Sequence, residues 1–213
     1  NLFSKYENVF TDDDGFLTEG LYKNEIQYTH IYTPRKLREK VYSVNQVGEI
    51  LYGKQDLRKI NGIESDSKYH SPILGFAYDG NPIYGPYAYS SKTGGFITQM
   101  LSGYSLSDNR TNRPSTSIYP EGFFVEDYVY KKSSSDSVLD ENNGRFCITP
   151  DYPNGTYAYF TTIDERFPED SGVFENYKKP SFPYVIGHNY HSIPNIFNFV
   201  NSSNSDDYDL EAN

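Results

Sequence analysis

The sequence predicts a mainly β fold, an antiparallel sandwich or barrel-like domain with long ordered loops and little helix. Aromatic residues make up 17% of the chain, with 22 Tyr and 14 Phe, and such residues prefer strands and bury large rings in a core. Gly and Pro interrupt the apolar segments every few residues, which favours short strands joined by turns. A chain of 213 residues is long enough for one large or two small domains of this kind.

The segment of residues 71–87 carries the clearest strand and turn signals. Its apolar residues 73–78 suit a buried strand. Asp79-Gly80-Asn81-Pro82 is a strong turn signal, because Asp and Gly tolerate left-handed backbone and Pro fixes the next φ. Residues 83–84 then return as a short strand, which Gly85-Pro86 ends because Pro offers no N–H to a β-ladder. The segment is therefore predicted to be a tight hairpin with a polar tip.

A second region of the same character lies nearer the C-terminus. Residues 123–130 and 156–162 are rich in aromatic and β-branched types, so both are predicted as strands. Asn154-Gly155, just before the second strand, is the favoured pair for a two-residue type I′ turn. We expect the side chains of Asp79 and Asn154 to stabilise their respective hairpins.

Composition divides the chain into three parts. Residues 1–65 are predicted to be a connecting segment or a small subdomain, and residues 66–196 form the β domain. Residues 197–213 are acidic and are predicted to be a linker or tail. Because residue 1 is Asn and no signal-peptide pattern follows it, we expect the chain to be part of a longer polypeptide.

The charge of the chain excludes several classes of function. A net charge of −10 argues against nucleic-acid binding, which needs a basic surface, and against docking on anionic lipid. No apolar segment approaches the roughly 18 residues of a membrane helix, so no membrane insertion is expected. The single Cys147 excludes an intrachain disulfide framework.

Four ordered blocks of the sequence resemble the YHYH domain family. The family pattern H-S-P-I-x-G-x-x-x-D-G-x-P-I-Y-G-P is nearly complete here from His70 to Pro86. A block of the form L-D-E-x-N-G-R follows at residues 139–145, and an F-P-Y-x-x-G block closes the pattern at residues 182–187. The third block departs from the family, since its Y-H-Y-H core reads Tyr157-Ala158-Tyr159-Phe160 and lacks both histidines.

This variant is similar to virion structural proteins of marine, cyanobacteria-infecting tailed phages. The resemblance implies a structural domain of a tail or baseplate protein, made in the host cytoplasm and placed in the virion, which provides inter-subunit packing and contact with the host surface. Its expected partners are other virion proteins, in a homo- or hetero-oligomer, and a host-surface glycan. The alternatives are a glycan- or divalent-cation-binding module and a metal-dependent secreted enzyme.

Several side chains are candidates for binding. Carboxylate and amide oxygens suit Ca²⁺, although the same residues also stabilise turns. Exposed Tyr in loops gives a large contact area at a small entropic cost. The binding candidates are Asp79, Asn81, Asp140, Glu141, Asn143, Arg145, Tyr104 and Tyr119. We expect the planar fork of Arg145 to pair with a carboxylate or a backbone carbonyl.

The histidines are the candidates for a transition metal. His188 and His191 are three residues apart in a predicted loop, and His70 joins them if the first hairpin folds back. No catalytic residue is assigned, because the chain has no G-x-S-x-G motif and Cys147 lies in a strand-like run typical of a small buried side chain. The sequence therefore predicts that the protein is not an enzyme and that it has no cofactor. Ca²⁺ or a transition metal is the ion that these candidate residues could hold.

Overall fold

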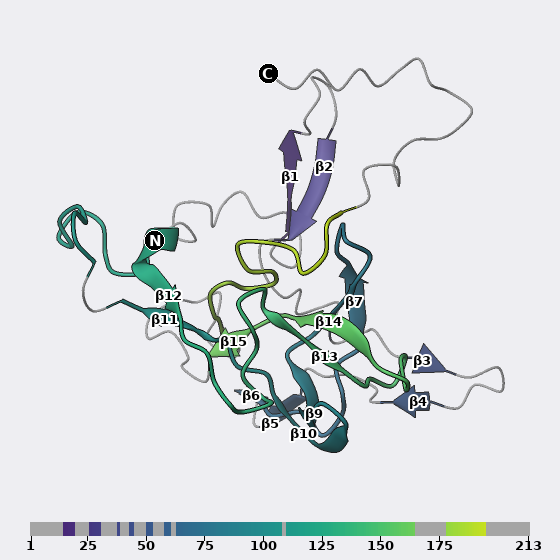
Figure 1. Cartoon of the computed structure of the whole chain (residues 1–213). Helices are drawn as coiled ribbons and strands as arrows, with labels where there is room; N and C mark the ends of the chain where they lie inside the picture. Colours follow the sequence, from purple (N-terminus) through teal and green to yellow (C-terminus); the bar gives the residue numbers. More distant parts are fainter. Residues whose placement is uncertain are drawn as a thin grey trace.

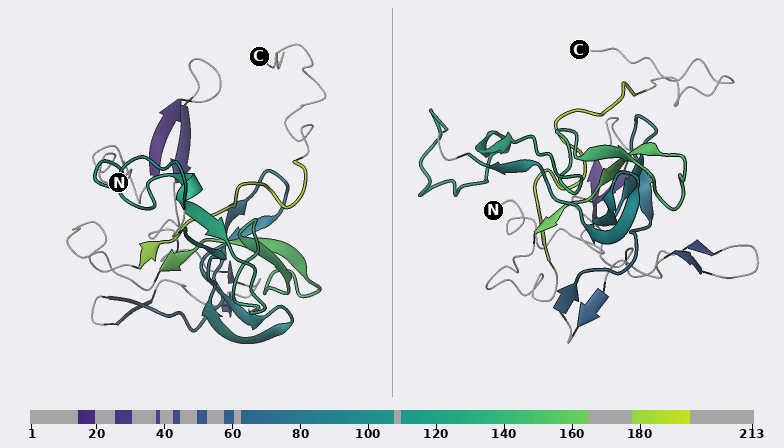
Figure 2. Two further views of the ribbon diagram at one scale, coloured as in Figure 1. Left: turned by 60° about the vertical axis from the view of Figure 1, so that its left-hand side comes forward. Right: turned by 60° about the horizontal axis from the view of Figure 1, so that its bottom comes forward.

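The computed structural model describes residues 63–107, 110–164 and 178–194, together with Arg38 and the backbone of five shorter strands nearer the N-terminus. Figures 1 and 2 show the short strands and long connections of this architecture. Among the described residues, no helix is long and apolar enough to cross a membrane.

The largest element is a four-stranded sheet built from the segments that carried the clearest strand signals. Its strands are β7 (Ile73–Phe76), β8 (Pro82–Tyr84), β13 (Gly144–Cys147) and β14 (Thr156–Phe160), in the order β13-β14-β8-β7. The pairs β7–β8 and β13–β14 are antiparallel, whereas β14 pairs with β8 in parallel. Two hairpins from distant parts of the sequence therefore join through one parallel contact.

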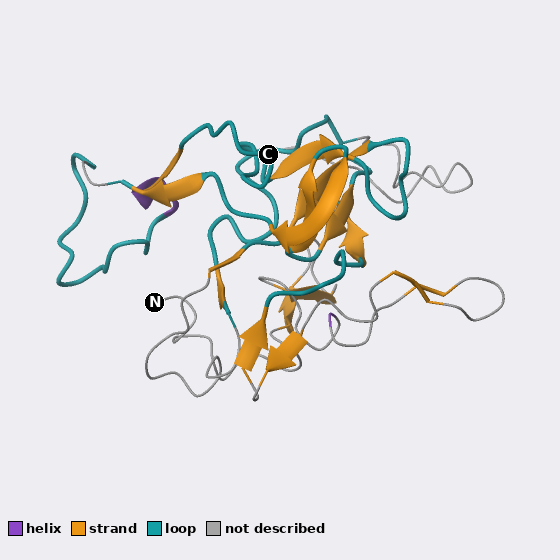
Figure 3. Cartoon of the chain, turned by 90° about the horizontal axis from the view of Figure 1, so that it is seen from below, coloured by secondary structure: helices purple, strands orange, loops and turns teal. Residues whose placement is uncertain are grey.

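The other described strands form two-stranded antiparallel sheets (Figure 3). Between residues 87 and 180 these are β9 (Tyr87–Ser91) with β10 (Gly94–Gln99), β11 (Tyr104–Leu106) with β12 (Tyr128–Tyr130), and β15 (Ile163–Asp164) with β16 (Lys179–Pro180). Nearer the N-terminus they are β1 (Gly15–Glu19) with β2 (Ile26–His30), β3 (Ser43–Val44) with β4 (Ile50–Tyr52), and β5 (Arg58–Ile60) with β6 (Ile63–Ser65). One 3₁₀ turn, η1 (Val125–Asp127), precedes β12.

The strand β14 is buried on both of its faces, and its successive side chains alternate between them. One face carries a cluster of buried residues that includes Tyr84, Ala158 and Phe160, packed against Ala88 and Met100. The opposite face carries Tyr157 and Tyr159. Residues 182–193, called the strap below, cross this second face, where Ile186 and Tyr190 pack against the two tyrosines.

The structure confirms the mainly β prediction and the first hairpin with its polar turn. The described strands do not close a barrel, and the parallel β8–β14 pair was not expected from the sequence. The strand expected over residues 123–130 is only partly right, because η1 occupies Val125–Asp127 and the strand begins at Tyr128. The predicted tail, residues 197–213, lies outside the described residues.

The predicted type I′ turn at Asn154-Gly155 is wrong. Of the two residues only Gly155 has a positive φ, of 93°. The turn begins at Tyr152, whose carbonyl accepts a hydrogen bond from the Gly155 N–H at 3.0 Å. Pro153 therefore occupies the second turn position, which its fixed φ favours, and this shifts the turn by one residue.

Candidate functional site

Two tyrosine–aspartate pairs lie side by side on one face of β14. Tyr157 and Tyr159 are two residues apart, so both side chains point to the same face. The Tyr159 hydroxyl donates to Oδ2 of Asp79 at 2.7 Å. The Tyr157 hydroxyl donates to the two carboxylate oxygens of Asp140, at 2.9 and 3.0 Å. The third block thus contacts the first block through one tyrosine and the second block through the other.

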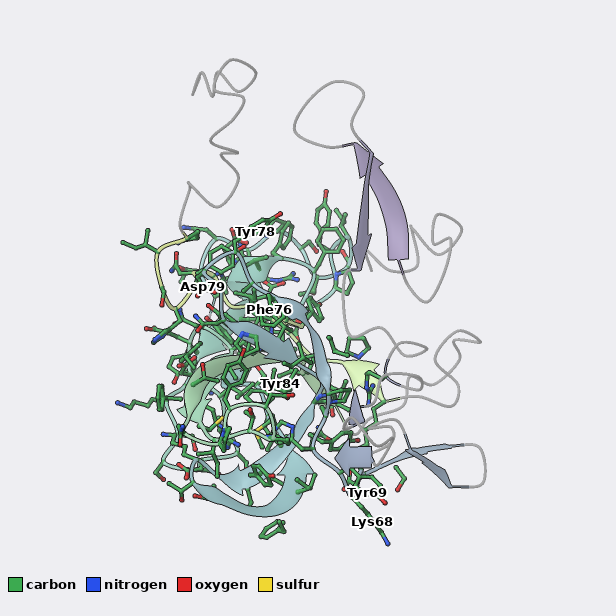
Figure 4. All side chains as sticks on the ribbon, turned by 90° about the vertical axis from the view of Figure 1, so that its right-hand side faces the viewer. Lys68, Tyr69, Phe76, Tyr78, Asp79 and Tyr84 are labelled. Carbon is green, nitrogen blue, oxygen red and sulfur yellow. The ribbon has the colours of Figure 1, made fainter. Side chains whose placement is uncertain are left out.

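Asp79 accepts hydrogen bonds from its own turn as well. The Asn81 backbone N–H donates to Oδ1 at 3.2 Å, and the Asn81 amide donates to Oδ2 at 2.8 Å. Gly80 has a φ of 84°, as the turn requires. Burial raises the pKa of Asp79, but the hydrogen bonds from Tyr159, Asn81 and Ser192 outweigh it, so the pKa lies below its usual value. Figure 4 shows Asp79 near Tyr78, in the upper part of the region drawn with side chains.

Asp140 organises the second turn in the same way. Its Oδ1 accepts the backbone N–H groups of Asn142 and Gly144, at 3.0 and 3.1 Å. Asn143 takes the left-handed conformation between them, with a φ of 63°. Its buried amide nitrogen donates to the carbonyls of Phe160 and Val185, at 2.9 and 3.1 Å. Asn143 therefore joins this turn to β14 and to the strap.

The strap is held at several points by these same residues. The His191 N–H donates to the Tyr159 hydroxyl at 2.6 Å, and the Ser192 N–H donates to Oδ2 of Asp79 at 3.1 Å. The His191 ring stacks on the Tyr157 ring, with centroids 3.6 Å apart and planes inclined by 7°. The first three blocks thus converge on the strap, whose beginning is the fourth block.

Asn142 also holds the strap. Its amide donates to the Asn189 carbonyl at 3.1 Å, and its own carbonyl accepts the Gly187 N–H at 3.0 Å. Gly187 lies against the backbone of Glu141, so close that a Cβ there would overlap the Glu141 carbonyl. The glycine of the fourth block is thus explained by a close approach of two backbones.

The hydroxyl groups of this site are donors rather than bases. Burial raises the pKa of Tyr157, and the neighbouring carboxylate of Asp140 raises it further. Burial likewise raises the pKa of Tyr159, as does its hydrogen bond to Asp79. Both phenols therefore stay protonated at neutral pH, and the carboxylates accept their hydrogen bonds. A catalytic base needs a free lone pair aimed at a substrate, and the Asp79 and Asp140 oxygens are directed to donors of the chain itself.

The opposite face of β14 carries Ala158 and Phe160, the positions where the third block differs from its pattern. Phe160 packs against the Tyr84 ring in a stacked arrangement and contacts the His70 ring edge-on, with centroids 5.7 and 6.3 Å apart. His70 is 3% exposed, and its Nδ1 donates to the Ser71 carbonyl at 2.7 Å. Burial lowers the pKa of His70 from 6.5 to about 4. A neutral imidazole therefore forms part of this core.

Arg145 pairs with backbone carbonyls, one of the two arrangements expected for it. Its Nη1 donates to the Asp136 carbonyl at 2.5 Å and its Nη2 to the Tyr89 carbonyl at 2.6 Å. Its guanidinium lies over the Phe160 ring, 5.6 Å from the centroid. Arg145, which belongs to β13, thus fixes two other segments to the sheet from within the core. Cys147 is buried next to it, and burial raises the pKa of the thiol.

The three candidate metal histidines lie in different surroundings. His70 is in the core, His191 is on Tyr157, and His188 contacts the Tyr104 ring at 5.6 Å. In the part of the chain that the structure describes, no group of three His, Cys, Asp or Glu side chains gathers as a metal site. The structure therefore brings these histidines to the sheet and the strap without bringing them together.

The remaining candidates divide between structural contact and exposed surface. The Tyr104 hydroxyl donates to the Glu141 carbonyl at 2.7 Å, so Tyr104 holds the second turn. The Glu141 residue is itself exposed. Tyr119 is 37% exposed and packs against Phe123 and Phe124 in the loop between β11 and β12.

Sequence reasoning missed a buried ion network in that loop. Asp127 is 3% exposed, and its Oδ1 accepts Arg110 Nη1 at 2.6 Å and Arg113 Nε at 2.7 Å. The hydrogen bond from Arg113 holds the pKa of Asp127 far below its usual range. Asp127 lay inside a segment predicted as a strand, and no local pattern marks a contact 14 or 17 residues away.

Comparison with known proteins gives one match. A family model described as "YHYH protein" matches residues 15–172, well over half of the chain. The match contains both tyrosine–aspartate pairs and ends before the strap. No curated protein and no solved structure matches the chain.

Proposed function

The chain belongs to the YHYH family, and from this premise we propose that it is a structural domain of a virion protein in a phage tail or baseplate. Its work is to provide a rigid β unit that packs against neighbouring subunits and meets the host surface. The domain holds no catalytic group in this proposal. It acts in the virion, after assembly in the host cytoplasm, in a homo- or hetero-oligomer.

The observation that carries the proposal is the internal use of the residues in the four blocks. Asp79 accepts four hydrogen bonds, from Asn81 twice, from Tyr159 and from Ser192. The amide of Asn143 and the guanidinium of Arg145 bind carbonyls of the same chain. Hydrogen bonds from buried polar groups to distant parts of the same chain favour one arrangement of the backbone. The blocks therefore support a role in shape rather than in reaction.

The surface of the domain supports contact with other subunits. Phe76, Phe96 and Phe146 are 61%, 75% and 62% exposed. Rings of this size are enriched in the buried parts of protein interfaces. The virion setting itself rests on the resemblance of the Tyr157-Ala158-Tyr159-Phe160 variant to tail and baseplate proteins.

Peptide mapping by mass spectrometry of particles purified from the natural source tests the proposal. We expect peptides from residues 63–194 to co-purify with the virion through a density gradient, and to be joined to further sequence in one polypeptide. Particles from which contaminating host proteins have been removed by protease treatment provide the control. Recovery of the peptides only in the soluble fraction, as a free chain, would overturn the virion assignment.

A further inference from the structure

A polar cavity of about 350 Å³ lies in the loop between β11 and β12. We call this part of the molecule, residues 104–107 and 110–130, the lobe. In Figures 1 and 3 the lobe extends away from the four-stranded sheet. Among the residues that the structure describes, those that line the cavity all belong to the lobe: Leu106, Ser107, Arg110, Arg113, Pro114, Ser115, Thr116, Glu121 and Asp127.

The cavity has a rigid floor. Asp127 Oδ2 accepts Arg113 Nη2 at 3.0 Å and the N–H groups of Gly122 and Phe124, both at 3.1 Å. The other N–H groups of Arg113 donate to Asp127 Oδ1 and to the carbonyls of Pro114, Tyr119 and Pro120. Every N–H of this guanidinium is thus engaged, and Arg113 holds the loop in shape. A long loop ordered by such a network is typical of a binding segment.

Other polar groups of the lining keep hydrogen-bonding capacity. Arg110 donates to Asp127 through Nη1, while its Nη2 lies 3.9 Å from Glu126, beyond hydrogen-bond distance. Its remaining N–H groups have no hydrogen-bond acceptor among the described residues, so they are available as donors for a ligand. Thr116 and Glu121 make no side-chain hydrogen bond within the described residues, so one offers a hydroxyl and the other a carboxylate.

These groups select a class of ligand. A bound anion would meet the carboxylate of Glu121 beside a guanidinium already paired with Asp127. A metal cation would meet two guanidinium groups, and an apolar ligand would leave the polar lining unsatisfied. A sugar hydroxyl both donates and accepts, so neighbouring hydroxyls can accept from Arg110 and donate to Glu121. Ligand cavities of about 300 Å³ or more hold small molecules of this size.

We propose that the lobe cavity binds one uncharged pyranose unit of a glycan, held between Arg110, Thr116 and Glu121. The proposal deepens the proposed function, since it gives a chemical class to the host-surface contact. It does not depend on the peptide mapping above: sugar binding tests the cavity, whereas peptide mapping tests the virion setting, and either can fail while the other succeeds.

Titration of the purified chain with methyl α-pyranosides of glucose, galactose and mannose tests the inference, with ¹H–¹⁵N NMR shifts as the readout. We expect at least one of them to shift backbone signals of lobe residues with a dissociation constant in the millimolar range, which is on the order of −4 kcal/mol. The methyl glucuronide of the same size should shift them much less, because the carboxylate of Glu121 in the lining repels the carboxylate of the sugar.

Paired variants locate the site. Thr116→Val removes a hydroxyl, and Glu121→Gln replaces a charged acceptor oxygen by an amide NH₂. Neither residue belongs to the floor, and each change should weaken binding about fivefold, the effect of one hydrogen bond. Glu126→Gln is the matched control, because Glu126 lies near Arg110 but does not line the cavity. No shift with any neutral sugar up to about 50 mM, or equal losses in Glu121→Gln and Glu126→Gln, would overturn the proposal.

Discussion

The hydroxyl of Tyr159 donates a 2.7 Å hydrogen bond to Asp79, which lies 80 residues earlier in the chain. The same hydroxyl accepts the His191 N–H at 2.6 Å. One phenol oxygen therefore joins the first hairpin, the central strand β14 and the strap. Because the Tyr159 side chain is fully buried, water does not readily replace these bonds when one partner is removed.

Tyr159→Phe should destabilise the domain by about 1–3 kcal/mol, because the ring is kept while the Asp79 carboxylate and the His191 N–H both lose a partner. Urea denaturation of the two proteins measures the change. Tyr69→Phe is the control, since Tyr69 is 49% exposed, and it should change stability by no more than about 0.5 kcal/mol. Equal stability of Tyr159→Phe and wild type would contradict the role given to this hydroxyl in holding the strap.

Gly187→Ala should destabilise the domain by about 1–3 kcal/mol, the usual cost of forcing extra atoms into a packed site. The added Cβ would overlap the Glu141 carbonyl and come within 3.0 Å of the Asn142 Cα, and backbone atoms cannot turn aside. Thermal denaturation gives the measurement. Gly75→Ala is the matched control, because a Cβ added at Gly75 would have nothing within 4 Å. A similar melting temperature for both variants would show that the strap does not need this close approach.

Gly155→Ala should lower the free energy of unfolding more than Asn154→Ala, because the observed turn needs a positive φ at Gly155 and none at Asn154. Gly155 has a φ of 93°, and a Cβ there would lie 2.9 Å from the Phe146 ring. We expect Gly155→Ala to cost about 1–2 kcal/mol and the exposed Asn154→Ala to cost less than about 0.5 kcal/mol. Equilibrium unfolding in urea compares the two variants. A larger loss for Asn154→Ala would restore the type I′ assignment.

Stability should fall as the pH drops from 6.5 to about 4, in part through His70. The folded state keeps His70 neutral with a pKa of about 4, against 6.5 as its ordinary value. In this window the unfolded state binds the proton more readily, so protonation favours unfolding; above pH 6.5 the effect disappears. The full loss from this one group is about 3 kcal/mol.

The His70 contribution can be separated from that of the carboxylates. Free energies of unfolding measured from pH 7 to pH 4 should decline less steeply in His70→Gln than in wild type. His188→Gln serves as the control and should keep the wild-type slope, because His188 is exposed. Parallel slopes for wild type and His70→Gln would exclude His70 as the source.

Added Ca²⁺ should leave the melting temperature unchanged. The Asp140 carboxylate already accepts two backbone N–H groups and the Tyr157 hydroxyl, and the Asn143 amide nitrogen is directed to two carbonyls. A ligand that binds the folded state raises its stability, so a rise in melting temperature with Ca²⁺, absent in Asp140→Asn, would favour the cation-binding alternative instead. Differential scanning calorimetry with and without chelator provides the measurement.

Features that depend on a few neighbouring residues could be predicted from the sequence. Asp79, Gly80 and Asn81 lie in the predicted turn between β7 and β8, and Pro82 begins β8. The side chain of Asp79 accepts the N–H two residues on, and Gly80 takes a positive φ, so the signal for this turn is local. The aromatic and β-branched run around Tyr157 became β14 for the same reason. Two local signals can also conflict. Pro153 favours the second position of a turn that begins at Tyr152, and this turn forms in place of the type I′ turn expected at Asn154-Gly155.

Which side chains meet depends on how distant segments pack, and the sequence did not predict it. Asp79, Asp140 and Arg145 could be chosen as candidates from their type and place, but their partners lie 80, 17 and 56 residues away. Such pairs form because a buried hydroxyl or guanidinium must find an acceptor wherever the packed chain offers one. No periodicity in the sequence encodes that choice. The contacts of the strap and of Asp127 join residues that are distant in the sequence, so only the tertiary structure determines them.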